Sequence, residues 1–205
     1  MYPPTELGTP TIEYLKSSLQ SLRMYRADRP NGYNDIADDA LRITRKSFER
    51  FRPFFVASHA IVTYHGSIQY HDAINLDVDI IIISDKKTPR VIFESAYKLQ
   101  NEMNNLESWP TGKCETNFAF LTLDQIEKET KLFNRGVQYD RNIHLDSMLG
   151  SCILTSELIF PKQQKDFDKI KNKFTDILKA SPVLLGATIE EVEDCIKTRK
   201  ERRMR

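Results

Sequence analysis

Apolar residues divide the chain into segments of helical and extended periodicity. They recur at steps of three and four over residues 11–23, which predicts a helix. The same spacing continues from Asn34, a residue suited to an N-cap, to about Arg52, where Pro53 is expected to close a second helix. The N-terminal region therefore begins with two amphipathic helices.

Short apolar runs rich in β-branched and aromatic residues follow. Residues 60–65, 76–84 and 114–123 predict three strands, because each run is bounded by turn-forming or polar residues. Between the second and third strands, helical spacing predicts a helix over about residues 91–106. A short charged helix is expected at 124–136. This alternation predicts an α/β (α+β) fold with a mixed sheet.

The last third of the chain is mostly helical in pattern. We expect an extended piece at 153–160 and a helix over 162–180. A second helix is expected from Thr188 to the end, because Thr188 and Glu191 have the spacing of a capping box.

The change in pattern predicts two regions that meet at Gly136. Residues 1–136 hold the N-terminal helices and the α/β core, and residues 137–205 form a mostly helical part packed on that core.

Composition narrows the class of protein. The 205 residues suffice for one good core, and a net charge of +1 gives no overall attraction to nucleic acids or membranes. The longest apolar run, 80–83, is far short of the roughly 20 residues that span a bilayer, and the N-terminus lacks the pattern of a secretory signal. Three widely spaced cysteines form no disulfide or zinc pattern. We therefore expect a cytoplasmic protein with no membrane partner.

The strongest chemical signal lies at the junction of the first two predicted strands. Gly66 and Ser67 end the first strand, and Asp77 and Asp79 open the second. Residues i and i+2 of a strand face the same way, about 7 Å apart by strand rise, so the two carboxylates share a face. Carboxylates suit Mg²⁺, and a glycine turn with free amides and a hydroxyl suits phosphate oxygens. The pattern indicates metal-dependent chemistry on a nucleoside triphosphate.

This segment resembles the nucleotidyltransferase superfamily of DNA polymerase beta and the small polymerase-like nucleotidyltransferases. The resemblance covers about residues 35–125 and rests on an apolar strand, Gly66-Ser67, and then Asp77-Val78-Asp79 after nine residues. It implies a mixed sheet flanked by helices and two Mg²⁺ (or Mn²⁺) ions. It also implies transfer of a nucleoside monophosphate from an NTP to an acceptor hydroxyl or other nucleophile, with release of pyrophosphate. By the same resemblance Asp77 and Asp79 hold the metals, while Gly66 and Ser67 bind the triphosphate.

The sequence departs from the family pattern in two places: the third acid, which would lie near the acceptor, and the residues after Gly-Ser, which would bind the triphosphate. The family places a third acid on a later strand, and here the middle of that strand has none. Glu115 at its start is the candidate, because alternation puts Glu115, Asn117 and Ala119 on one face, and Asp124 at its end is the weaker choice. After Gly-Ser the family often has an arginine and a glycine, where this chain has 68–71, Ile-Gln-Tyr-His.

Two alternative functions follow from the sequence. A catalytically weak or inactive protein of the same fold would bind a nucleotide or a partner protein. A nucleic-acid-binding module would use the basic residues near the C-terminus, which include Lys197, Arg199 and Lys200. The sequence leaves open the acceptor (small molecule, protein or RNA end), the choice of NTP and the oligomeric state.

Overall fold

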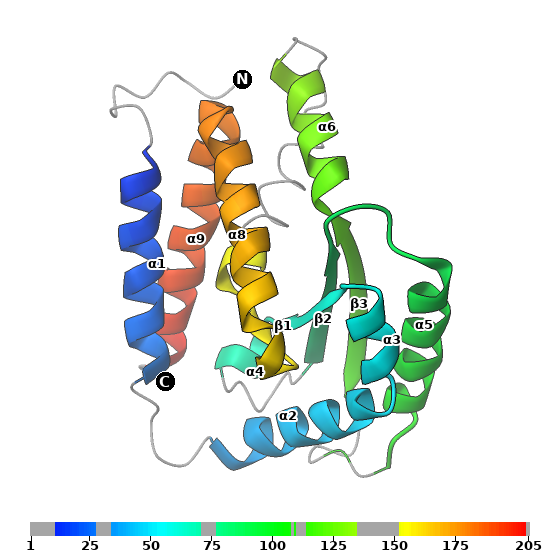
Figure 1. The fold of residues 1–205 in the computed structure, drawn as a ribbon. Helices are drawn as coiled ribbons and strands as arrows, with labels where there is room; N and C mark the ends of the chain where they lie inside the picture. Colours follow the sequence, from blue (N-terminus) through cyan, green and yellow to red (C-terminus); the bar gives the residue numbers. More distant parts are fainter. Residues whose placement is uncertain are drawn as a thin grey trace.

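A computed structural model describes residues 11–27, 34–70, 77–107, 109, 114–134 and 152–203. It shows a four-stranded mixed sheet with helices on both faces (Figure 1). The expected α/β fold with C-terminal helices is thereby confirmed. None of the helices in the described ranges is both long and apolar enough to cross a membrane.

The elements follow the chain in this order. The N-terminal half contains α1 (Ile12–Ala27), α2 (Asn34–Glu49), α3 (Arg52–Ala57), β1 (Ile61–His65), α4 (Ser67–Tyr70), β2 (Asp77–Ser84) and α5 (Arg90–Asn104). The C-terminal half contains β3 (Glu115–Thr122), α6 (Leu123–Asn134), a helical turn at 152–155, β4 (Glu157–Leu158), a 3-10 turn (Pro161–Gln163), α8 (Gln164–Lys179) and α9 (Pro182–Arg203).

The strands lie in the order β3-β2-β1-β4. Strand β1 is antiparallel to β2 and to β4, while β2 and β3 are parallel. The end of β1 and the starts of β2 and β3 therefore meet at one end of the sheet. The register there places His65 opposite Asp79, Asp77 beside Glu115, and Asp79 beside Asn117.

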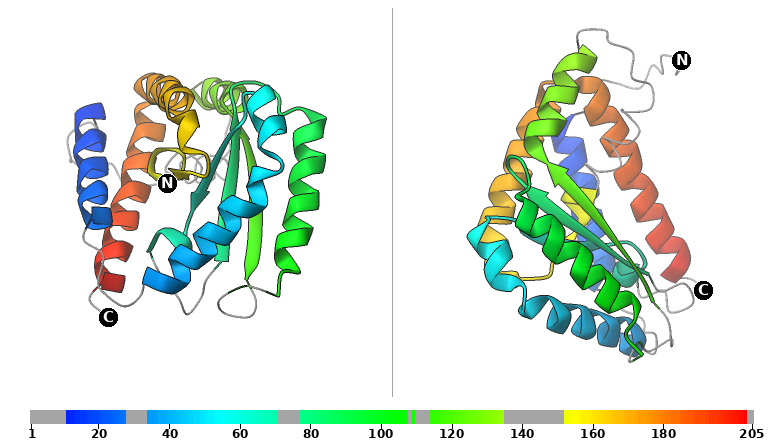
Figure 2. Two further views of the ribbon diagram at one scale, coloured as in Figure 1. Left: turned by 60° about the horizontal axis from the view of Figure 1, so that its bottom comes forward. Right: turned by 90° about the vertical axis from the view of Figure 1, so that its right-hand side faces the viewer.

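Each face of the sheet packs its own hydrophobic core. Alternation sends the side chains of Val62, Ile80 and their neighbours to a first core, which is covered by α2, α3 and α5. Ile61, Ile81 and Ile83 point to a second core, which is covered by α1, α8 and α9 (Figure 2). Asp77 and Asp79 continue this second face, beyond the part that the isoleucines fill.

Helix boundaries correct two expectations. Helix α2 ends at Glu49, and Pro53 does not close it but lies in the first turn of α3, where its missing N–H costs no hydrogen bond. Helix α9 begins at Pro182, so the expected start at Thr188 is wrong. Thr188 is buried, and its hydroxyl donates to the carbonyl of Leu184 one turn earlier, at 2.8 Å. A threonine can satisfy itself in this way inside a helix, so its spacing to Glu191 does not identify an N-cap.

The segment expected to be extended at 153–160 is only partly so. Residues 152–155 form a helical turn, and β4 has two residues. The expected boundary near Gly136 lies outside the described residues. Beyond it, β4 pairs with β1, so the C-terminal region supplies a strand to the sheet.

Candidate functional site

Gly66 turns the chain between β1 and α4 directly beside the carboxylate of Asp79. Its φ is +81°, a left-handed conformation that L-residues with a side chain rarely adopt. A Cβ placed on Gly66 would lie 2.3 Å from Oδ2 of Asp79. Both observations require glycine here, and they show that the turn and the second aspartate adjoin.

Three carboxylates gather at this end of the sheet. Asp77 and Asp79 are half-buried and Glu115 is exposed. Burial raises the pKa of Asp79 above its usual 3.8, and the negative charges of Asp77 and, more weakly, Glu115 raise it further. The amide of Asn117 opposes this by donating to Asp79 Oδ1 at 3.3 Å. Asp79 therefore carries its charge at a cost that a nearby cation would relieve.

The pKa of the Cys114 thiol, just before β3, is affected by the same three carboxylates. Burial raises the pKa of its thiol to about 12, together with the charges of Asp77, Asp79 and Glu115. Cys114 and the three carboxylates thus share one electrostatic environment, in which each carboxylate disfavours a further negative charge.

The predicted site residues can now be placed. Gly66, Asp77, Asp79 and Glu115 come together at one end of the sheet. Ser67 opens α4 beside Gly66, and its side chain lies outside the described part of the chain.

Asp124 is separated from this group. It lies at the far end of β3, in the first turn of α6, with Lys128 at 3.6 Å. The side chain of Arg199 in the basic C-terminal segment also lies outside the described residues.

Divalent metal binding depends on which oxygen atoms this end of the sheet can offer. Within the described residues, no three His, Cys, Asp or Glu side chains form a group arranged to hold a metal ion. Mg²⁺ needs fewer protein ligands than that, since it keeps several waters and commonly takes one or two carboxylates plus substrate phosphates. Asp77 and Asp79, with Glu115 beside them, fit that requirement in donor type and in their unfavourable mutual charge.

Sequence reasoning missed the contacts that fix the glycine turn. His65 Nε2 lies 3.1 Å from Thr155 Oγ1, and the amide of Gln69 donates to the carbonyls of Tyr64 and Thr155, both at 3.2 Å. His65 and Gln69 could have been selected as candidates from the sequence, because both lie close to Gly66 along the chain. Nothing local marks Thr155, which is about 90 residues away in sequence.

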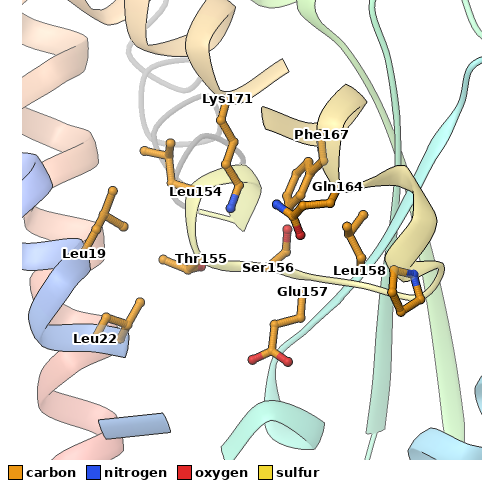
Figure 3. A pocket seen from close by; sticks show the side chains of 11 residues that line it. Leu19, Leu22, Leu154, Thr155, Ser156, Glu157, Leu158, Gln164, Phe167 and Lys171 are labelled. Carbon is orange, nitrogen blue, oxygen red and sulfur yellow. The ribbon is translucent and has the colours of Figure 1, made fainter. Parts of the chain in front are cut away.

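A cavity of about 490 Å³ lies next to this contact, between α1, the 154–158 segment and the start of α8 (Figure 3). Thr155 lines it, so the segment that braces the glycine turn also forms part of the cavity wall.

Comparison of the chain with known protein families, characterised proteins and solved structures gave no match.

Proposed function

We propose that this protein is a metal-dependent nucleotidyltransferase, which moves a nucleoside monophosphate from an NTP to an acceptor nucleophile and releases pyrophosphate. The observation that carries the proposal is the contact between Gly66 and the Asp79 carboxylate, with Asp77 and Glu115 alongside. A phosphate-binding turn and adjacent acids are what such a transfer needs. The resemblance of Gly66-Ser67 and Asp77-Val78-Asp79 to the nucleotidyltransferase motif supports the same reaction.

Each residue has a role in this proposal. Asp77 and Asp79 hold Mg²⁺, and the chain at Gly66 and Ser67 approaches the β- and γ-phosphates with its backbone amides. Glu115 orients the acceptor hydroxyl or takes its proton. Bound Mg²⁺ would supply charge neutralisation on the phosphates and on the leaving pyrophosphate. The chain itself contributes position, since little covalent chemistry is required of the protein.

The proposal places the reaction in the cytoplasm, in keeping with three cysteines, Cys114, Cys152 and Cys195, that form no disulfide.

The test is nucleotide turnover with a matched control. The protein is incubated with each labelled NTP and Mg²⁺ or Mn²⁺, and pyrophosphate release and labelled acceptors are measured. The double variant Asp77→Asn/Asp79→Asn should lose Mg²⁺-dependent NTP binding. Asp85→Asn should retain it, because Asp85 follows the other end of β2 and pairs with Lys173 instead. Equal binding of Mg²⁺·NTP by the wild type and the double variant would refute the site.

A second candidate function is nucleotide binding without turnover. It is favoured by β3, where Asn117 stands beside Asp79 and the only acid of the strand, Glu115, is exposed at its start. Tight Mg²⁺-dependent binding of an NTP, with no pyrophosphate released for any acceptor offered, would support this candidate over the enzyme.

A further inference from the structure

The two edges of the sheet differ in how well they are protected from pairing with another chain. Strand β4 forms one edge and has only two residues. Strand β3 forms the other with eight residues, in an unbroken register with β2 and without lysine or proline. Shortness, charge, proline and bulges are the usual protections of an edge strand, so β4 is protected and β3 is not. Figure 2 (right) shows β3 beside α5, with no described element lying over its outer edge.

Side chains of α5 show which peptide groups of β3 point out of the sheet. The N–H of Thr116 donates to Asn104 Oδ1 at 2.9 Å, and its carbonyl accepts from the amide of Gln100 at 2.7 Å. Thr116 therefore directs its backbone away from β2, and alternation gives Phe118 and Phe120 the same direction. Within the described ranges, no hydrogen bond satisfies the outward N–H and C=O groups of these two phenylalanines. They can bond to a further strand.

Aromatic side chains flank the same stretch of β3 on the side of α5. Phe120 contacts Phe93 and Tyr97 of that helix, with ring centroids 4.3 and 6.2 Å apart. Phe93 and Phe120 are half-buried, whereas Tyr97 is 59% exposed. A strand that paired with β3 would also cover this aromatic cluster, so main-chain hydrogen bonds and apolar contacts would act together.

We propose that β3 of a second copy of this chain pairs with this edge, antiparallel and about a two-fold axis at Ala119. Phe118 of each copy then exchanges both backbone hydrogen bonds with Phe120 of the other copy. Thr116, whose groups are already bonded within its own chain, is not required. None of the residues at the axis belongs to the candidate site, so the proposal holds whether or not the protein transfers nucleotides.

Charge and shape favour a second copy as the occupant of this edge. The strand has no charged residue after Glu115, and antiparallel pairing holds the two Glu115 side chains about 27 Å apart by strand rise. Like charges therefore do not oppose each other across the strands. The two Ala119 residues meet at the axis as a closely spaced pair, which small side chains accommodate. The contact is the same patch on both copies, so it closes as a dimer.

Sedimentation velocity at a series of protein concentrations tests the association. The wild type should sediment as a dimer at high concentration and as a monomer on dilution. Ala119→Lys places two ammonium groups opposite each other at the axis and should leave only monomer. Tyr97→Glu should weaken dimerisation by about tenfold or more, whereas Val183→Glu, the same change at a residue that is 54% exposed on α9, should have no effect. Circular dichroism shows whether each variant is folded.

Cysteine cross-linking tests the register. Ala119→Cys brings two thiols together at the axis and should form an intermolecular disulfide on mild oxidation. Thr122→Cys, on the same strand, keeps the two thiols about 20 Å apart and should not. The wild type, with three cysteines of its own, is the second control. A wild type that stays monomeric at every concentration, a dimer that survives Ala119→Lys, or cross-linking of Ala119→Cys no greater than that of Thr122→Cys would each overturn the proposal.

Discussion

At the scale of single residues, the candidate site depends on the close contact between the backbone of Gly66 and the carboxylate of Asp79. Gly66 adopts a conformation that side chains disfavour, and the space where its Cβ would stand is taken by the Asp79 carboxylate. Asp79 in turn is charged in a partly buried place beside other acids. The glycine accepts its conformation without strain, whereas the charge on Asp79 costs stability, and in the proposed function a bound cation relieves that cost.

Replacing Gly66 with alanine should lower the free energy of unfolding by about 1–2 kcal/mol, the cost of a left-handed conformation for an L-residue. It should also weaken Mg²⁺·NTP binding, because the Asp79 carboxylate has to move away from the new methyl group. Urea denaturation and nucleotide titration measure the two effects. In an Asp79→Ala background the glycine substitution should cost less, and an equal cost in both backgrounds would show that the carboxylate does not constrain Gly66.

The raised pKa of Asp79 predicts how stability depends on pH. The folded state holds this proton more tightly than the unfolded state, in which the pKa is about 3.8. The stabilising contribution of Asp79 is therefore fully present below that pH and is lost as pH rises through the folded-state pKa. Without divalent ions, Asp79→Asn should raise the melting temperature at pH 7 by about 2–4 °C and should have no effect near pH 3.

Thermal unfolding of the wild type, Asp79→Asn and Asp85→Asn at several pH values checks this expectation. A melting temperature of Asp79→Asn below that of the wild type at pH 7 would contradict it. Mg²⁺ with NTP should raise the melting temperature of the wild type and leave that of Asp79→Asn unchanged.

At the scale of elements, one side chain helps to extend the sheet where strand pairing is short. Strand β4 has only two residues, and beyond it the buried Gln163 bonds to β1. Its amide nitrogen donates to the carbonyl of Ala60 at 2.8 Å, and its amide oxygen accepts from the N–H of Val62 at 3.4 Å. A glutamine side chain here takes the place of a backbone partner.

Gln163→Leu should therefore destabilise the protein by about 2–3 kcal/mol, because it leaves two buried backbone groups at the start of β1, those of Ala60 and Val62, without this partner. Gln164→Ala is the control. Gln164 is exposed and bonds only within its own helix, to Asp168, so we expect a change within about 0.5 kcal/mol. Urea denaturation distinguishes the two; similar small effects would mean that water satisfies Ala60 and Val62.

At the scale of the whole molecule, the first and last helices of the described chain lie side by side and close the second core (Figures 1 and 2). The sequence suggested two regions, yet both cores use opposite faces of the same strands. We therefore expect the described parts of the two regions to unfold together.

Leu15→Ala tests this cooperativity. Leu15 is 2% exposed in the second core, so the substitution should cost about 2–5 kcal/mol. Trp109, the only tryptophan, is buried in the first core and reports on that core by fluorescence. Tryptophan fluorescence and circular dichroism should shift to lower urea by the same amount. A tryptophan transition that stays in place would show two independently stable parts.

The sequence by itself determined the local elements and the main candidate residues. Strands β1 to β3 and helices α1 and α5 follow from apolar periodicity, because spacing alone decides which side of a segment can be buried. The pairing of Asp77 with Asp79 on one face likewise follows from the two-residue repeat of a strand.

Only the tertiary structure decided which distant groups meet. The parallel register brought Glu115 to Asp77 and left Asp124 at the far end, and long-range packing brought Thr155 to His65. Local periodicity carries no information on such contacts, because they depend on strand order and on which helices cover each face. Thr188 shows a related limit: its spacing to Glu191 suggested an N-cap, whereas α9 begins at Pro182 and buries Thr188 within the helix.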